Sequence, residues 1–433
     1  MTRMNTPLIS LEKISVRPDV QRAVQIAVGD LAGNIRNFQD GLLDAPQPCL
    51  MAGLDYCTPW TRDAAFNTWF SAGLLFPEAA KNTLLSVLKK SGDVSPRIGG
   101  QYWDAIIWAQ GAWQHYLFNQ DIDFLRLAHE AVETSLQDFL RDEFDPADGL
   151  FRGGACFQDG VAGYPDFFAP PGIRFSGIPE WIENSGPLRH PSGGGVPCKA
   201  LSTNCLYYRA FRILELMARE LGLPAPDGWS RRADDLREAI NAAFYDEAAG
   251  SYHYLVDAPG TDPRQEGLGW AFVLLFGIAD DSQAERLFQN VHLTPHGMPC
   301  LWPTYPRYER LGEYGRHSGC IWPQVNAVWA LACQARGRGD LAMKELDLLT
   351  AKACRDSEFI EVFHPVSGLP YGGMQEDASG GINRYPVVHR QSWCASGYLA
   401  MVLFCLLDIR MDDDHPLAAG TKDEINALFP QLR

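Results

Sequence analysis

Hydrophobic positions recur at helical spacing along most of the chain, and this pattern predicts a protein built almost entirely of helices. The stretch from Leu206 to Met217 is typical, because its apolar residues fall at intervals of three or four and Gly222-Leu-Pro224 then ends the helix. A short helical piece is also expected near 421–429. The twelve long segments are 17–38, 62–76, 78–91, 102–119, 121–142, 199–221, 228–244, 266–277, 280–291, 321–336, 338–354 and 391–409.

The connections between these segments alternate between short and long, which predicts helical hairpins. If the first helix pairs with the last, the helices form a closed ring, and all the long loops leave it at one end. We therefore predict an all-α fold, an (α/α)6 barrel. Residues 1–433 would form one domain in which helix 17–38 closes the ring against helix 391–409. The long loops are 39–61, 92–101, 143–198, 245–265, 292–320 and 355–390, and loops longer than about 12–15 residues are usually functional.

A short motif recurs after the outer helices. Residues 144–154 and 363–373 share the pattern F-x-P-x-x-G-L-x-x-G-G, and 244–252 is a looser copy. The spacing from Pro to Gly suits a tight turn, in which Pro fixes φ and Gly accepts a positive φ. The repeat supports a ring of hairpins but indicates no chemistry.

Composition excludes several classes of protein. The 433 residues are 46% hydrophobic and 21% charged, which excludes general disorder. The net charge of −16 argues against a nucleic-acid partner. Residues 1–36 lack the apolar core of a signal peptide, and no run is long enough for a membrane span. The 11 cysteines contain no CxxC pair, so we expect buried, reduced thiols in a cytoplasmic protein.

Candidate chemistry begins where the first long loop enters an inner helix. Arg62 and Asp63 lie there beside Trp60. A carboxylate at this place can accept bonds from the start of the helix, or it can hold sugar hydroxyls beside a stacking indole. Before the next inner helix, Trp103 and Asp104 follow Gln101 and are further candidate sugar contacts, although for Asp104 a helix cap is the favoured interpretation.

Two further loops carry pairs of carboxylates in aromatic company. Glu180 and Glu183 lie among Trp181, Ile182 and several prolines, with Asn184 adjacent. Apolar surroundings raise the pKa of a carboxyl group, as a general acid requires. Glu358 and Glu361 form the second pair. Their place on the predicted loop face distinguishes both pairs from ordinary surface glutamates.

The last candidates lie at the starts of two late helices. His317 could act as a general base, although a structural histidine is the favoured interpretation. Trp322, Asn326 and Trp393 could line a pocket or simply pack. The histidines and cysteines show no metal-binding pattern, and the phosphate-loop and nucleophile-elbow motifs are absent.

Four segments together resemble the six-hairpin glycoside hydrolases, most closely the mannosylglycerate hydrolase-like members of family 63, and more distantly trehalases and glucoamylases. Trp60-Thr-Arg-Asp63 is similar to the family's W-D-S segment, and Ile182-Glu-Asn-Ser185 to its M-D-N-S segment. Ile321-Trp-Pro-Gln-Val-Asn326 is similar to I-W-P-x-x-N, and Glu361-Val-Phe-His-Pro-Val-Ser-Gly368 to E-x-Y-x-P-x-T-G. The chain departs from the family in having Glu183 where the family has Asp, although glucoamylase-like relatives use Glu there.

The resemblance implies an inverting, exo-acting α-glycosidase for a small α-glucoside or α-mannoside. Glu183 would be the general acid and Glu361 the general base, with Glu180 and Glu358 as rival assignments. Inversion requires the two carboxyl groups to stand about 6.5–9.5 Å apart, whereas about 5 Å would indicate retention. Arg62 and Asp63 would hold hydroxyls that do not react. Glucosylglycerate, mannosylglycerate and α-glucosyl disaccharides are all candidate substrates.

The resemblance implies no metal or organic cofactor. The expected partner is a small carbohydrate, with neither nucleic acid nor membrane, and a homo-oligomer is compatible with the sequence. Two other functions stay open. An α/α-barrel sugar epimerase would use paired histidines, for example His317 and His389, and a non-catalytic toroid would bind carbohydrate without hydrolysing it.

Overall fold

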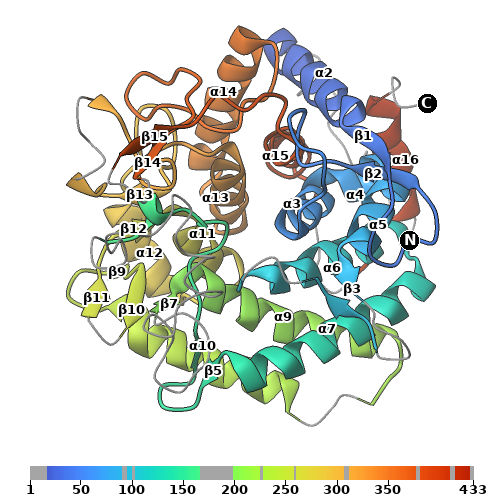
Figure 1. Ribbon diagram of the computed structural model, residues 1–433, viewed down its shortest axis with the longest axis horizontal. Coiled ribbons are helices and arrows are strands. Elements are labelled where there is room, and N and C mark those ends of the chain that lie inside the picture. Colours follow the sequence, from blue (N-terminus) through green and yellow to red (C-terminus); the bar gives the residue numbers. More distant parts are fainter. Residues whose placement is uncertain are drawn as a thin grey trace, which may run out of the picture.

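The computed structural model describes residues 17–89, 95–99, 103–165, 198–224, 228–257, 260–306, 312–376, 381–409 and 415–429. In these parts of the chain, helices form an inner and an outer ring (Figure 1). Each inner helix packs against the next, and α15 contacts α3 and closes the ring. The inner ring consists of α3 (Thr61–Asn67) with η1 (Thr68–Ala72) and α4 (Gly73–Leu75), α6 (Trp108–Asn119), α9 (Leu201–Glu220), α11 (Gly267–Leu275), α13 (Pro323–Ala335), and α15 (Ser392–Ala400) with η7 (Met401–Leu406).

The outer ring confirms the predicted (α/α)6 barrel. Its α2 packs against both α14 and α15, so the first helix described lies beside the last inner one. The outer helices are α2 (Pro18–Gly33), α5 (Pro77–Ser86), α7 (Ile122–Asp142), α10 (Trp229–Phe244), α12 (Asp281–Asn290) and α14 (Gly339–Asp356), and α16 (Ala419–Leu428) follows the barrel. None of the helices described here combines the length and apolarity that a membrane crossing needs.

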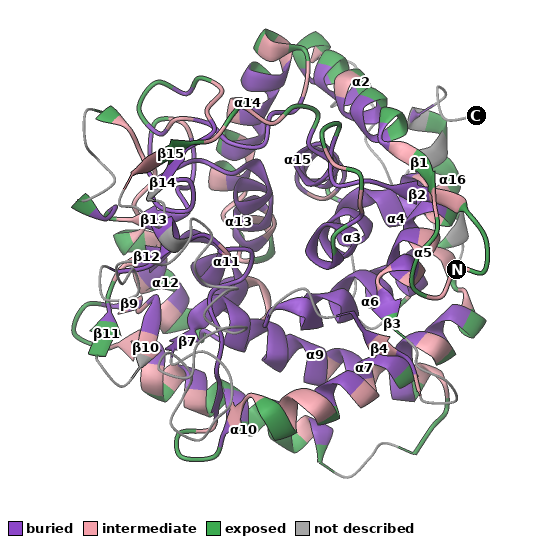
Figure 2. Cartoon of the chain, viewed as in Figure 1, coloured by how far each residue is buried: buried purple, intermediate pink, exposed green. Residues whose placement is uncertain are grey.

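Burial explains why the rings differ in composition. All nine residues of α15 and eight of the nine in α11 are buried, whereas α12 buries only Ala284 and Leu287 (Figure 2). An inner helix is covered on all sides by neighbours, so it has no need of a polar face, whereas an outer helix keeps one face in water. Polar caps at the starts of outer helices include Asp121 on α7 and the Asp280–Gln283 capping box on α12.

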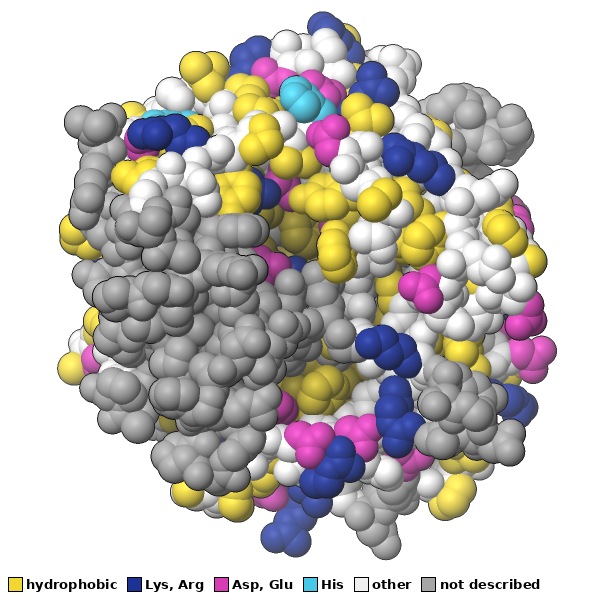
Figure 3. All heavy atoms as spheres, viewed as in Figure 1, with side chains coloured by type: hydrophobic (Ala, Val, Ile, Leu, Met, Phe, Trp, Pro, Cys, Tyr) yellow, Lys and Arg dark blue, Asp and Glu magenta, His cyan; other side chains and the backbone are white. Residues whose placement is uncertain are grey.

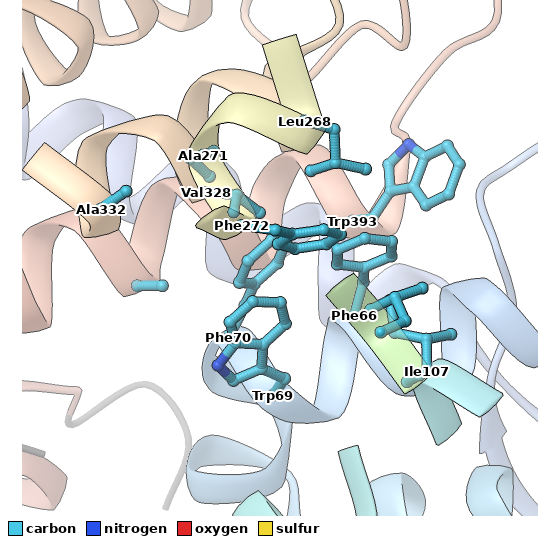
Figure 4. Packing of buried hydrophobic residues seen from close by; sticks show 14 of the residues in the cluster. Phe66, Trp69, Phe70, Ile107, Leu268, Ala271, Phe272, Val328, Ala332 and Trp393 are labelled. Atoms are coloured by element: carbon cyan, nitrogen blue, oxygen red, sulfur yellow. The ribbon is translucent and has the colours of Figure 1, made fainter. Parts of the chain in front are cut away.

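Aromatic rings fill the middle of the barrel. Phe66, Trp69 and Phe70 come from the first inner helix, Phe272 from α11 and Trp393 from α15 (Figure 4). Phe66 meets Trp393 edge to face with ring centroids 6.0 Å apart and stacks on Trp69 at 5.9 Å. The barrel axis is therefore a packed core at this depth.

Short strands form small antiparallel sheets in the connections between the helices. The turn prediction for the repeated motif is confirmed, because Gly149 and Gly368 have φ of +75° and +66°. Antiparallel pairs join β1 to β2, β3 to β4, β5 to β6, β8 to β9, β12 to β13 and β14 to β15, and β10 lies between β7 and β11. The strands are β1 (Ile35–Phe38), β2 (Gln47–Leu50), β3 (Leu88–Lys89), β4 (Arg97–Ile98), β5 (Phe144–Asp145), β6 (Leu150–Phe151), β7 (Cys198–Ala200), β8 (Tyr245–Asp246), β9 (Ser251–Tyr252), β10 (Leu255–Asp257), β11 (Gly260–Asp262), β12 (Gln265–Glu266), β13 (Leu301–Trp302), β14 (Met374–Glu376) and β15 (Ile382–Arg384).

Some predicted helices have different limits. The helix expected over 17–38 ends at Gly33, because the Asn34 side chain donates to Arg390 O at 2.7 Å and to Ser392 Oγ at 2.9 Å and draws the chain across to α15. The helix expected over 102–119 begins later, as the 3₁₀ turn η2 (Ala105–Ile107). The helices expected over 62–76 and 391–409 contain the π-helical segments η1 and η7.

The cysteines agree with the expectation of buried thiols. All 11 lie in described parts of the chain, none forms a disulfide, and nine are buried. Cys57 is exposed and Cys354 is partly buried.

Candidate active site

A cavity of about 300 Å³ lies where the inner helices α3, α13 and α15 begin. The long loops bring further side chains to its wall, and Figure 3 shows a hollow near the centre of this face with hydrophobic, acidic and basic side chains around it. Its described lining is Tyr56, Trp60, Arg62, Asp63, Phe157, Asp159, Gly160, Arg316, His317, Trp322, Glu361, Gln375, Tyr385, Pro386, Val388, Gln391 and Trp393.

Glu361 is held in this cavity by three donors. Its side chain is 3% exposed. Oε1 accepts hydrogen bonds from the Tyr56 hydroxyl at 3.0 Å and from Gln391 Nε2 at 3.2 Å. Oε2 accepts from the Arg316 guanidinium. A buried carboxylate with this many donors is fixed in orientation.

Arg316 is itself fixed from several sides. Its Nη1 donates to Gly372 O at 2.7 Å. The guanidinium lies 4.9 Å from the Trp322 ring centroid and 5.1 Å from that of Tyr385. The two aromatic faces favour a cation between them, so the position of Glu361 depends on a buried arginine that is held in place.

The charges of Arg62, Asp63 and Asp159, which also line the cavity, follow from burial. Burial raises the pKa of Asp63 to about 8, although Arg62 acts in the other direction. Burial also opposes ionisation of Asp159, but the charge of Arg62, the strongest of several opposing effects, helps to outweigh it and lower the pKa of that carboxyl group. Arg62 Nη2 donates to Asp159 Oδ2 at 2.9 Å. At neutral pH this part of the lining therefore holds an ion pair beside a largely protonated Asp63.

His317 is neutral in this environment. Burial lowers its pKa to about 3, against the opposing effect of Asp159. The ring stacks on Trp322 with centroids 5.1 Å apart. A histidine with so low a pKa is too weak a base to take up a proton near neutral pH, so it is not suited to act as a general base there.

Four buried polar atoms of the cavity lining have no partner among the described residues. They are Asp63 Oδ1, His317 Nδ1, Gln391 Oε1 and Trp393 Nε1. An unpaired buried polar atom is costly, and protein or water usually pairs it. Unpaired donors and acceptors in the lining of one cavity, together with aromatic rings, suit a ligand rich in hydroxyl groups.

Several of the predicted site residues meet here. Trp60, Arg62, Asp63, Trp322, Trp393 and Glu361 all line the cavity. Trp60 stands at its rim and is 39% exposed, whereas the other five are almost fully buried. Glu358 is not part of the cavity lining. Its carboxylate instead accepts a hydrogen bond at 2.9 Å from the exposed His389. His389 is likewise absent from the described lining, so His317 and His389 do not meet in this cavity.

Three predicted contacts, Trp103, Asp104 and Asn326, are not among the described residues that line the cavity. Trp103 packs in a separate cluster and donates from Nε1 to Ala155 O at 3.0 Å. Asn326 donates to Glu345 Oε2 at 3.0 Å on the outer helix α14.

Asp104 supports the cavity from behind. Its Oδ2 accepts from Phe157 N at 2.7 Å and lies 3.6 Å from Arg62 Nη1. Asp104 occupies the N-cap position of the following 3₁₀ turn, but its side chain makes no capping hydrogen bond there. Gln101, Glu180, Trp181, Glu183 and Asn184 lie outside the described residues.

The sequence interpretation missed several residues of the wall. Tyr56, Asp159, Arg316, Gln375 and Tyr385 were not singled out. Their nearness to features already noted was the one sequence signal for two of these residues. Arg316 directly precedes His317, and Asp159 closely follows a copy of the F-x-P-x-x-G motif. Nothing in the sequence indicated that Arg316 would pair with a carboxylate 45 positions away.

A helical barrel whose loop end holds a fixed carboxylate among aromatic rings is compatible with a glycoside hydrolase, and a family match identifies the class. Residues 60–377 match the mannosylglycerate hydrolase MGH1-like glycoside hydrolase domain. The chain belongs to this family and is a glycoside hydrolase. No curated protein matches the chain in a sequence search.

Solved structures share the fold at low sequence identity. A family 63 mannosylglycerate hydrolase from Thermus thermophilus in complex with glucose superposes with a TM-score of 0.65 at 17% identity, over 90% of this chain and 100% of that one. The same kind of enzyme in complex with Tris and D-glycerate gives 0.60 at 18%, over 89% and 99%. The neutral trehalase of Saccharomyces cerevisiae gives 0.55 at 13%, over 95% and 84%.

Proposed function

We propose that this glycoside hydrolase is an inverting, exo-acting α-glycosidase that removes one glucose or mannose unit from a small α-glycoside. The observation that carries the proposal is Glu361, a buried carboxylate fixed by Tyr56, Gln391 and Arg316 at the wall of a sugar-sized cavity. Inversion is typical of the family. Glu361 is the general base in this proposal.

The reaction consists of one displacement. A water molecule attacks the anomeric carbon while Glu361 takes its proton, and the bond from that carbon to the glycosidic oxygen breaks. The general acid protonates the departing oxygen, and Glu183, from the segment 166–197, is assigned this role by the resemblance of Ile182-Glu-Asn-Ser185. Asp63, His317 and Trp393 offer their unpaired polar atoms to the hydroxyls of the bound sugar.

The depth of the cavity supports exo action. Trp393 forms part of the wall, and the aromatic core that includes Phe66 lies behind it. A glycan chain cannot continue through this packed layer, so the sugar that enters is a terminal one. The aglycone then leaves toward the rim, where Trp60 is partly exposed.

The test combines mutation with the stereochemistry of the product. Glu361→Gln and Glu183→Gln are each expected to lower kcat by about 10²- to 10⁴-fold while the fold is retained. Glu358→Gln is the matched control, because that carboxylate lies outside the cavity and its loss should leave kcat nearly unchanged.

A panel of α-glucosides and α-mannosides, including glucosylglycerate, mannosylglycerate and trehalose, identifies the substrate. NMR of the first product formed is expected to show the β-anomer. Release of the α-anomer, or near-full activity in both Gln variants, would refute the proposed mechanism.

A further inference from the structure

A second cavity, of about 620 Å³, lies toward the other end of the barrel, where α11, α13 and η7 end, and we call it the distal cavity. Its wall comes from the middle of α6 and α9 and from the last turns of α11, α13 and η7. The candidate active site lies instead where the inner helices begin. The described residues that line the two cavities do not overlap.

Aromatic packing separates the two cavities. Trp393 lines the candidate active site, Trp69 lines the distal cavity, and Phe66 contacts both rings at 6.0 and 5.9 Å (Figure 4). Trp69 also lies 6.3 Å from Phe276, which is part of the distal wall. A molecule in the distal cavity is therefore not an extension of a substrate in the active site.

The polar groups of the distal wall are mostly carboxamides. Gln110 Oε1 accepts from Arg209 Nε at 2.7 Å, and Gln334 Nε2 donates to Asp408 Oδ1 at 3.1 Å. Gln114 is 4% exposed, and its Nε2 has no partner among the described residues. A buried amide nitrogen on the wall of a cavity indicates a missing acceptor.

The charges and the rings on this wall indicate the chemistry of the ligand. The cationic Arg209 and the anionic Asp408 balance each other. An anion would need surplus positive charge here, and a hydrocarbon would leave Gln114 unpaired. Trp69, Phe276 and Phe404 supply flat apolar faces, and such faces beside carboxamides suit a sugar, which has apolar C–H faces and a rim of hydroxyls.

The backbone around the cavity is also unusual. Trp69 lies in the π-helical η1 and Phe404 in the π-helical η7. Asp408, just after η7, has a φ of +56°. Short π-helical segments and positive φ at residues other than glycine are unfavourable, and they occur frequently at functional sites.

We propose that the distal cavity is a second carbohydrate site, which binds a neutral mono- or disaccharide. Its volume falls in the range of about 300–1,000 Å³ that is usual for small-molecule sites. The inference does not depend on the proposed reaction, because none of its residues takes part in that reaction.

The experiment uses the full chain with Glu361→Gln, so that a bound sugar is not hydrolysed. Calorimetric titration with D-glucose and with trehalose is expected to detect sugar binding. This binding should persist when Trp60→Ala is added at the rim of the active site. Adding Gln114→Leu should weaken this binding roughly three- to tenfold, as expected for the loss of one hydrogen bond. Gln289→Leu, on the exposed face of α12, is the matched control and should change nothing.

A second variant keeps the test valid if Gln114→Leu fails to fold. Ala335 lines the cavity and is exposed, so Ala335→Trp should fold and abolish distal binding by filling the space. Crystals soaked in the sugar should show it between Trp69 and Phe404. The proposal is overturned if sugar binding is unchanged in the foldable variants, if sugar is found only in the active site, or if inorganic phosphate binds the distal cavity as tightly as sugar.

Discussion

The guanidinium of Arg316 donates a hydrogen bond to the carboxylate of Glu361 while it lies between the rings of Trp322 and Tyr385. The general base proposed above needs a fixed orientation to take a proton from water, and this arginine contributes to that orientation. Lysine would keep the charge but lose the planar contact with both rings and the second bond to Gly372.

Arg316→Lys is therefore expected to lower kcat by about 10²-fold, as small misplacements of a catalytic group do, with a smaller change in KM. Steady-state kinetics on the identified substrate gives both numbers. Arg384→Lys is the control, since that arginine pairs with Glu313 at an exposed place. Equal kcat in the Arg316 variant and the wild type would show that Glu361 is oriented without it.

Substitutions at Asp63 test the protonation state assigned to this group of the cavity lining. Because its pKa is raised to about 8, the carboxyl group is mostly protonated at pH 6 and can donate and accept as a carboxamide does. Asp63→Asn should then keep kcat/KM within about tenfold of the wild type at pH 6, whereas Asp63→Leu should lose about 100-fold or more. If the Asn variant is as inactive as the Leu variant at pH 6, the ionised carboxylate is the form that works.

Glu266 makes stability depend on pH. It is fully buried, its Oε2 accepts from Ser202 N at 3.0 Å, and burial raises its pKa to about 8 while Ser202 opposes the shift. The folded state thus holds the proton more tightly than the unfolded state. Its stabilising contribution is full below about pH 4.5 and is lost as the pH rises to about 8.

Glu266→Gln should remove this dependence. Urea unfolding at pH 5 and pH 8 is expected to show that the variant loses less stability between the two than the wild type does, by an amount on the order of a few kcal/mol. Glu285→Gln, on the exposed side of α12, serves as the control. An identical pH dependence in wild type and Glu266→Gln would mean that Glu266 is ionised in the fold.

Asn326 should affect stability rather than binding. Its side chain donates to Glu345 Oε2 at 3.0 Å and to Met298 O at 3.2 Å, and all of these groups are buried. Asn326→Ala leaves both acceptors without this donor and is expected to cost about 1–3 kcal/mol in the free energy of unfolding, with KM unchanged. A large rise in KM with unchanged stability would show instead that Asn326 contacts the substrate.

Periodicity was sufficient to predict the barrel, because an inner helix and an outer helix carry different hydrophobic patterns. The alternation of loop lengths further indicated the end of the barrel where the site lies. Helix limits were less accurate wherever a tertiary bond decided them, as at Asn34.

Individual site residues were predicted less completely for a geometric reason. Successive helical residues point about 100° apart, so proximity to a helix start does not decide which side chain enters the cavity. Asp63 faces the cavity and Asn326 faces the outer ring, although both lie in the first turns of inner helices. Long-range pairs such as Arg316 with Glu361 have no local signature at all.

The contact of α2 with α14 and α15 also has a consequence for synthesis of the protein. Asp30 accepts a hydrogen bond from Phe359 N, two residues before Glu361, and Asn34 bonds to Ser392. Partners more than 300 positions apart come together only after the ribosome has made nearly the whole barrel. A nascent chain therefore carries the uncovered inner faces of its early hairpins until then, and depends on chaperones or on rapid closure to avoid aggregation.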